Sequence, residues 1–315
     1  MSRLILIAII FVLASSVFSE GFVNDFLRMD TDIRSSGMGS CNIASTGAAA
    51  LFGNPAYIGI GDIAFIGHER LYDGLLIADA AGLSLNFVGP GNFAIGAIYV
   101  GGGGIEVTGL PNPAAPISAQ NRPYVISEKG HHDFALVPGY SIPVGKDLRI
   151  GAAAGAVYRH NVDDNAFGVS FRAGAGWSPI QNLDIGAVVG DASYISWNTG
   201  TSEIGAPSFS VGSGYEAVLG AGFGAMVCAE GSYSIQEKLF EGFAGIELSY
   251  KELFAIRGGF NNHNFTAGAD LRIFDGLRAG ASLSIHEDLP ISYRIGLSLR
   301  EFGKVLNETD EIPES

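Results

Sequence analysis

Basic residues and cysteines are scarce in this 315-residue chain. Lysine and arginine number 18 against 32 aspartates and glutamates, which gives a net charge of −14 at neutral pH. Nucleic-acid binding needs basic patches, so this balance argues against a nucleic-acid partner. The chain has 2 cysteines, which are too few for a small domain held together by disulfides.

Long hydrophobic runs are missing after the N-terminus. Arg3 precedes an apolar run from Leu4 to Ala14, and Val17-Phe18-Ser19 has the small residues of a cleavage site. This pattern predicts a secretory signal at 1–19. The apolar run is too short to span a bilayer, and no later stretch approaches the length of about 18 apolar residues that a transmembrane helix needs. We therefore expect no transmembrane helix in the mature chain.

Strict alternation of apolar with polar or glycine residues is what the chain has in abundance. It is clearest in 265–273, 277–285 and 291–299, where every second residue is apolar and the others include charges and glycines. A period of two predicts strands with two different faces. An apolar face opposite a charged one suits a strand between lipid and a polar lumen. Lipid leaves no partner for an open sheet edge, so we expect a closed barrel.

The predicted fold class is all-β, a 14-stranded antiparallel transmembrane β-barrel with an N-terminal hatch segment in the lumen. The predicted strands are 62–71, 75–88, 92–100, 132–142, 147–160, 165–178, 183–191, 207–216, 221–234, 239–250, 253–261, 264–274, 276–286 and 291–302. Every second connection is short, whereas the long connections Gly101–His131 and Ala192–Ala206 both fall at the opposite end. Short periplasmic turns and longer outer loops are the asymmetry expected of such barrels.

The segment before the first strand has a different character, because it does not alternate. Its alanine run, Ala48–Ala50, predicts a short helix of about two turns that ends at Gly53 and the turn pair Asn54-Pro55. We expect four parts: the signal at 1–19, a hatch at 20–61, the barrel at 62–302 and a solvated acidic tail at 303–315.

Charged residues on the inward phase of the strands are candidate lumen-facing residues. They are Arg149, Arg159, Arg172, Glu230, Glu241, Glu247, Arg257, Asp270, Arg272, Arg278 and Arg294. One interpretation is a permeation path for a polar or anionic solute. The other, which mixed signs favour, is a network of ion pairs that tethers the hatch to the wall, since an unpaired charge in a dry interior is costly.

The two cysteines fall where the hatch would meet the wall. Cys228 is on an inward phase and Cys41 lies in the predicted hatch, so a disulfide between them is one interpretation in an oxidising compartment. Two unpaired buried thiols are the alternative, and we favour it because a sequence does not give the Cα separation that a disulfide requires.

Signals for enzymatic chemistry are weak. The chain has no Gly-x-Ser-x-Gly, His-Glu-x-x-His or phosphate-loop motif, and the adjacent pair His131-His132 points opposite ways in a strand. We predict no enzyme activity, no metal and no cofactor. The connection Gly101–His131 contains four prolines and is a candidate lid or docking surface.

Two motifs in the predicted hatch resemble a known family. Arg34-Ser35-Ser36-Gly37-Met38-Gly39, followed by small residues and Asn54-Pro55-Ala56, is similar to the hatch signature of the PorV/PorQ group in the FadL-like superfamily. The runs Ala255–Phe260 and Tyr293-Arg294-Ile295 are also similar to that group. The resemblance implies a 14-stranded barrel in the outer membrane of a Gram-negative-type bacterium. It also implies a hatch or gating role for Arg34, Gly37, Gly39, Asn54, Pro55 and Ala56.

Two functions are compatible with that resemblance. The first is a secretion-associated barrel of PorV/PorQ type, which binds secreted cargo or secretion-system proteins through its outer loops. The alternative is a FadL-like channel for uptake of long-chain fatty acids or other hydrophobic compounds, opened by a rearrangement around Asn54-Pro55-Ala56. In both cases outer-membrane lipid surrounds the barrel.

Overall fold

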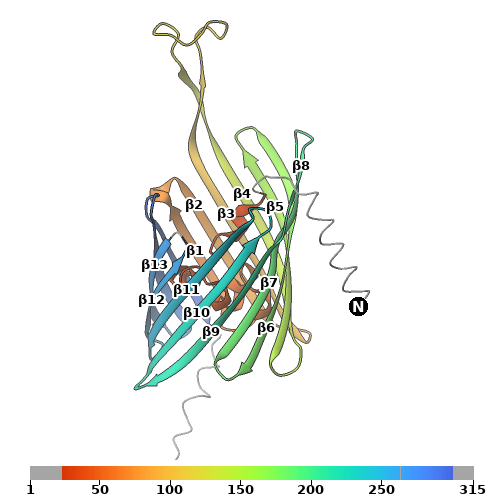
Figure 1. Ribbon diagram of the computed structural model, residues 1–315, viewed down its shortest axis with the longest axis vertical. Helices are drawn as coiled ribbons and strands as arrows, with labels where there is room; N and C mark the ends of the chain where they lie inside the picture. The colour runs from red at the N-terminus through yellow and green to blue at the C-terminus, as the bar shows by residue number, and fades with distance from the viewer. Residues whose placement is uncertain (1–22, 263, 301–315) are drawn as a thin grey trace, which may run out of the picture.

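The computed structural model describes residues 23–262 and 264–300 (Figure 1). The predicted signal at 1–19 and the acidic tail at 303–315 lie outside these residues. Among the described residues, no helix is long and apolar enough to cross a membrane. In chain order the elements are η1 (Asp25–Arg28), α2 (Ile33–Gly37), η2 (Asn42–Ala44), η3 (Gly47–Leu51), η4 (Pro55–Tyr57), β1 (Asp62–Leu71), η5 (Tyr72–Gly74), β2 (Leu76–Val88), β3 (Gly91–Gly109), β4 (Tyr124–Pro143), β5 (Leu148–Asn161), β6 (Asp164–Ile180), β7 (Leu183–Trp197), β8 (Ser202–Gly205), β9 (Ser208–Gly220), β10 (Phe223–Ser234), β11 (Leu239–Tyr250), β12 (Phe254–Asn261), β13 (Asn264–Phe274), β14 (Leu277–His286) and β15 (Ser292–Arg300).

The strands form a closed antiparallel ring, as predicted. β1 pairs with β15, β6 pairs with β7, and β7 pairs with β9, so the sheet has no free edge along the ring. In the described part of the chain, the short β8 pairs only with the end of β7 and stands outside the ring. The remaining strands make up a 14-stranded barrel, because 15 strands less β8 leave 14. Closure gives every strand two hydrogen-bonded neighbours, which lipid requires.

The two ends of the barrel differ in the length of their connections. One end has only tight turns, such as the two residues between β9 and β10, whereas a long β3–β4 hairpin projects from the other end (Figure 1). Because outer loops are the longer ones in barrels of this kind, the projecting end faces the outside.

The prediction of a long loop at Gly101–His131 is wrong. β3 continues to Gly109, β4 begins at Tyr124, and the two stay in register except at bulges, one of which lies between Gly102 and Ile105. The glycine run does not end β3, because a bulge absorbs the irregularity and the ladder resumes. The predicted connection Ala192–Ala206 is likewise partly strand, since β7 extends to Trp197 and β8 pairs back onto it.

The predicted short helix at the alanine run is present, as the 3₁₀ helix η3, Gly47–Leu51, with Phe52 as its C-cap. Five residues make just under two turns, because a 3₁₀ helix has about three residues per turn. At its start Gly47 has a φ of +68°, and a Cβ on it would lie 1.9 Å from the carbonyl oxygen of Asp62. The start of η3 is therefore in close contact with the start of β1.

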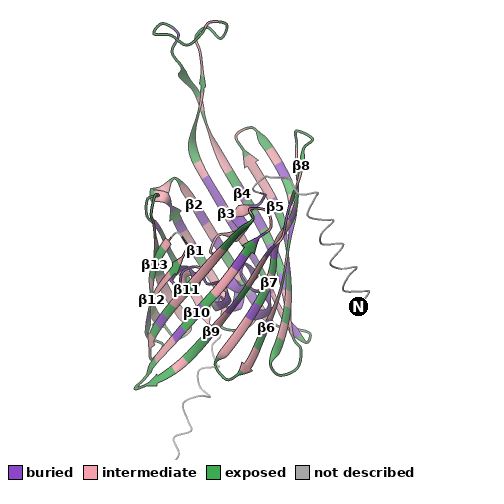
Figure 2. Cartoon of the chain, in the orientation of Figure 1, coloured by how far each residue is buried: buried purple, intermediate pink, exposed green. Residues whose placement is uncertain are grey.

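Large apolar side chains cover the outer face of the ring. Ile246 is 49% exposed, Ile256 53% and Ile295 54%, and less exposed residues alternate with exposed ones along β11 and β12; Figure 2 shows the burial of each residue along the strands. Exposed aliphatic and aromatic side chains of this extent are stable in lipid rather than water. The closed barrel with this apolar exterior is an outer-membrane protein.

The lipid-facing band can be tested with a charge. Ile246 lies on the outer face of β11, between Val227 of β10 and Gly258 of β12. Ile246→Arg should lower the free energy of unfolding by about 2–4 kcal/mol, because an arginine in the apolar middle of a bilayer is costly. Urea unfolding in lipid vesicles measures the change.

Leu219→Arg is the matched control, since Leu219 is exposed beside the turn after β9 and should lose at most about 1 kcal/mol. Equal losses for both variants would contradict the assignment of the outer face to lipid.

Candidate functional site in the barrel lumen

The N-terminal segment, defined here as residues 23–61, lies inside the barrel (Figure 1). Its helix α2 contacts β12 to β15, η3 contacts β1 to β4, and η4 contacts β4 to β6. Most of its side chains are buried, including Met38, Leu51 and Ile58, which are each at most 1% exposed (Figure 2). The geometry of the lumen is therefore set by how this segment is held to the wall.

Arg34 holds the first part of the segment to β11. The side chain of Asp32 accepts hydrogen bonds from the backbone of Arg34 and Ser35, which begins α2 and directs Arg34 toward the wall. The Arg34 guanidinium then donates from Nη2 to Glu247 Oε1 at 2.9 Å and from Nε to Glu247 Oε2 at 3.1 Å. This two-point contact is the strong, directional form of an arginine–carboxylate pair.

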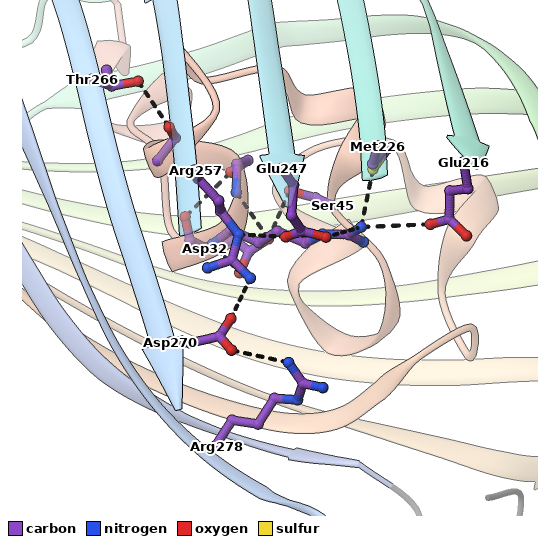
Figure 3. A network of polar contacts seen from close by, with 12 residues as sticks. Asp32, Ser45, Glu216, Met226, Glu247, Arg257, Thr266, Asp270 and Arg278 are labelled. Atoms are coloured by element: carbon purple, nitrogen blue, oxygen red, sulfur yellow. Dashed lines mark hydrogen bonds and ion pairs between the residues drawn. The ribbon is translucent and has the colours of Figure 1, made fainter. Parts of the chain in front are cut away.

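Glu247 is also the first member of a chain of charges across the wall. It pairs with Arg257 of β12, which pairs with Asp270 of β13, which pairs with Arg278 of β14 (Figure 3). The side chains of Glu247, Arg257 and Asp270 are all nearly inaccessible to solvent. Alternating signs on four neighbouring strands keep each buried charge beside an opposite one, as burial requires.

Glycines on the wall give the segment room beside these charges. Gly39 has a φ of +75°, and its N–H donates to Thr266 Oγ1 at 2.8 Å. A Cβ on Gly259 would lie 2.1 Å from the nitrogen of Gly39, and a Cβ on Gly245 would lie 2.4 Å from the carbonyl oxygen of Met38. Only glycine permits this approach of backbone to wall.

A second contact with the wall involves Asn54-Pro55-Ala56. The Asn54 side chain accepts from Ala56 N at 3.1 Å and donates to the carbonyl oxygen of Ala175 in β6 at 3.0 Å. A Cβ on Gly151 would lie 2.2 Å from the carbonyl oxygen of Pro55, and one on Gly174 would lie 2.0 Å from Asn54 Oδ1.

Helix α2 and η4 lie on nearly opposite sides of the ring, since α2 contacts β12 to β15 and η4 contacts β4 to β6. From β5 to β14 there are eight steps through β6 and β7 and six steps through β1 and β15. The N-terminal segment therefore crosses the lumen from wall to wall rather than lining one side.

The segment separates two cavities. The outer cavity, about 700 Å³, reaches the projecting end and is lined there by Leu71, Leu239 and Asn261. The inner cavity, about 660 Å³, reaches the short-turn end and is lined there by Asp62 and Arg300. Within residues 23–262 and 264–300, no residue lines both cavities.

The outer cavity is acidic. It is lined by two guanidinium groups, Arg28 and Arg172, and by seven carboxyl groups: Asp25, Asp30, Glu69, Asp191, Glu230, Glu237 and Glu241. Arg28 contacts Glu237 at 3.0 Å and Glu241 at 2.9 Å. Burial raises the pKa of the Asp25 carboxyl to about 6, against the opposing effect of nearby Arg28.

The remaining lumen charges predicted from the sequence also face inward, and most contact the segment or a partner on the wall. Arg149 donates to the Ala56 carbonyl, Arg159 pairs with Asp133, Arg172 pairs with Asp191, Glu230 accepts from Ile43 N, Glu241 pairs with Arg28, and Arg294 pairs with Glu69. Arg272 differs, because it forms no ion pair with any residue in the described part of the chain.

Sequence reasoning missed several residues of this site. Arg28, Asp30 and Glu69 were not singled out, although Glu69 lies on the same inward phase of β1 as Phe65 and Gly67. The alternation along β1 could have identified Glu69 as an inward-facing residue. Arg28 lies in a segment whose apolar and polar residues do not alternate, so the sequence could not show where its side chain points.

Comparison with known proteins agrees with the fold. No protein-family model matches the chain, and no curated protein matches it. Among solved structures it is similar to the toluene transporter TbuX of Ralstonia pickettii, with 13% identity, a TM-score of 0.53, and coverage of 87% of this chain and 99% of that one. It is also similar to the monoaromatic hydrocarbon channel CymD, with 10% identity, a TM-score of 0.58, and coverage of 87% and 98%.

A Pseudomonas aeruginosa FadL homologue is similar as well, with 11% identity, a TM-score of 0.50, and coverage of 85% and 97%. The chain therefore shares the barrel fold of these three structures.

The glycine contact between segment and wall is directly testable. Gly259→Val should displace residues near Gly39 and speed hydrogen–deuterium exchange of the peptide 33–44 at least several-fold, because a side chain at 259 collides with the Gly39 backbone. Mass spectrometry of the folded protein in detergent measures this exchange.

Gly258→Ala is the matched control, because a Cβ on Gly258 meets no atom within 4 Å. Unchanged exchange in Gly259→Val, with the barrel still folded, would mean that the segment does not depend on this contact.

Proposed function

We propose that the protein is an outer-membrane channel for small hydrophobic compounds, with the N-terminal segment as its hatch. The observation that carries the proposal is the division of the lumen into two cavities by a segment whose α2 and η4 contact opposite sides of the wall. Such an arrangement suits a solute that binds in the outer cavity and moves to the inner cavity when the segment changes position. The similar structures named as a toluene transporter and a monoaromatic hydrocarbon channel support this choice.

The outer cavity suits a small and largely apolar molecule. Its volume of about 700 Å³ lies within the range of ligand sites, roughly 300–1,000 Å³. Apolar side chains line it between the charges: Met29, Ile43, Phe52, Leu71, Leu239 and Phe243. Seven carboxyl groups against two guanidinium groups disfavour the anion of a fatty acid, so we propose a neutral compound as the substrate.

The hatch has a weaker and a stronger attachment. On the Asn54-Pro55-Ala56 side, Asn54 donates a neutral hydrogen bond to Ala175, a type of bond worth about 0.5–1.5 kcal/mol, and Arg149 donates one charged hydrogen bond to the Ala56 carbonyl. Arg34 holds the other side through a buried, two-point contact with Glu247, and charged hydrogen bonds are worth about 1.5–3 kcal/mol each. We propose that the passage opens at the Asn54-Pro55-Ala56 side, while Arg34, Gly37 and Gly39 stay attached.

A bulky residue in the outer cavity should block uptake. Ser210 lines this cavity from the inner face of β9. Ser210→Trp should reduce protein-dependent uptake of radiolabelled toluene into cells by about tenfold, since an indole fills space that the solute needs. Val211→Trp is the matched control, because Val211 is the next residue of the same strand and is 61% exposed to lipid.

Uptake by cells that make the unaltered protein is compared with cells that make none. The proposal fails if the protein accelerates no hydrophobic solute, or if both tryptophan variants transport alike.

The projecting hairpin supports a second candidate, a secretion-associated role in partner binding. Near its tip Ile117 is 70% exposed, Tyr124 53% and Ile126 59%, although this part lies beyond the lipid-covered wall. Among the residues that the structure describes, the hairpin strands beyond the rim pair only with each other, which leaves backbone groups on both outer edges without a strand partner there. Apolar side chains and open edges are features of protein-docking surfaces.

Replacing residues 103–130 with an Asn-Gly turn separates the two candidates. The turn joins strands that already pair at Gly102 and His131, so the barrel should remain folded. If the protein is only a channel, toluene uptake stays within about twofold of the unaltered protein. If it serves secretion, the amount of exported protein chemically cross-linked to the barrel on the cell surface falls to background.

A further inference from the structure

The N-terminal segment follows the inner face of β10 through three successive inward residues. Arg34 Nη2 lies 3.0 Å from Met226 Sδ, and Ile43 N donates to Glu230 Oε2 at 3.0 Å. Between them, buried Cys41 lies beside the inward-facing Cys228, whose strand neighbour Gly245 is in close contact with the backbone of Met38. The contact is therefore one step of an ordered path in which the segment and the strand run side by side.

The cysteine contact is enclosed. Cys41 is 0% exposed and Cys228 is 6% exposed, and the structure holds both as thiols. The two residues paired with Cys228 on the neighbouring strands are Gly214 and Gly245, which have no side chains to separate the thiols. These are the only 2 cysteines in the sequence, so neither has another intramolecular partner.

We propose that Cys41 and Cys228 form a disulfide in the mature protein, which ties the N-terminal segment covalently to the barrel wall. The two thiols lose two protons and two electrons as the sulfur–sulfur bond forms. The acceptor is the disulfide of a thiol-oxidising protein of the cell envelope, which becomes a dithiol. Exported proteins meet such an oxidising environment before they insert.

A disulfide at this place would restrict how the lumen opens. Residues near Cys41 would stay beside β10, together with the Arg34 contact to Glu247. The later part of the segment, from η3 to η4, has no cysteine and would remain attached only by non-covalent contacts. This inference does not depend on which solute, if any, the barrel transports.

Thiol counting on the intact protein tests the proposal. The full chain is exported with its signal into the outer membrane and extracted under denaturing conditions. One sample is treated directly with excess N-ethylmaleimide, and a second is reduced before the N-ethylmaleimide is added. Mass spectrometry then gives the intact mass of each. We expect no added maleimide in the unreduced protein and two in the reduced protein. A digest of the unreduced sample should contain one peptide pair that joins Cys41 to Cys228.

Cys41→Ser and Cys228→Ser are matched controls, each of which should take up one maleimide with or without reduction. Two maleimides on most unreduced molecules of the unaltered protein would overturn the proposal. So would an unlabelled protein whose digest lacks the joined peptides, because its thiols would then be blocked in another way.

Discussion

Backbone hydrogen bonding in lipid is the constraint on which this structure depends. A bilayer offers no partner to an unpaired N–H or C=O, so the wall must close on itself. The antiparallel pairing of β1 with β15 meets that demand and places the first and last strands side by side. Once closure is required, every strand has one face in lipid and one in the lumen, and the period-two pattern of the sequence follows.

The lumen has the opposite problem, since it must accommodate charges away from bulk water. The structure pairs the charges: Glu247 lies between the guanidinium groups of Arg34 and Arg257. Asp270 lies between those of Arg257 and Arg278, so that Arg257 is shared by both carboxylates. The glycines of the wall complete the arrangement, because they bring backbone close enough for Arg34 to reach β11. The ion pairs between the segment and the wall therefore depend on the glycines that allow the two to approach.

The barrel could be predicted from the sequence because strand faces obey a local rule. Alternation alone predicted strands at 276–286 and 291–302, and the structure has β14 at Leu277–His286 and β15 at Ser292–Arg300. It also predicted that Arg257 and Asp270 point inward, where they form an ion pair. Pairs between distant residues could not be predicted in this way. Nothing local shows that Arg34 meets Glu247 rather than another inward acid, since ring closure decides which strands face the segment. The β3–β4 hairpin was missed for a related reason, because a strand that survives a glycine run depends on its neighbour.

The position of the N-terminal segment has a consequence for the order of assembly. The segment is made first, and its η3 and η4 contact β1 to β6, whereas Arg34 and α2 contact β11 to β15, which belong to the last third of the chain. Arg34 and α2 cannot reach their final contacts until nearly all strands exist, and contacts between such distant residues form slowly. One half of the interior can therefore be packed early in assembly, whereas the other half is completed only together with the last strands of the wall.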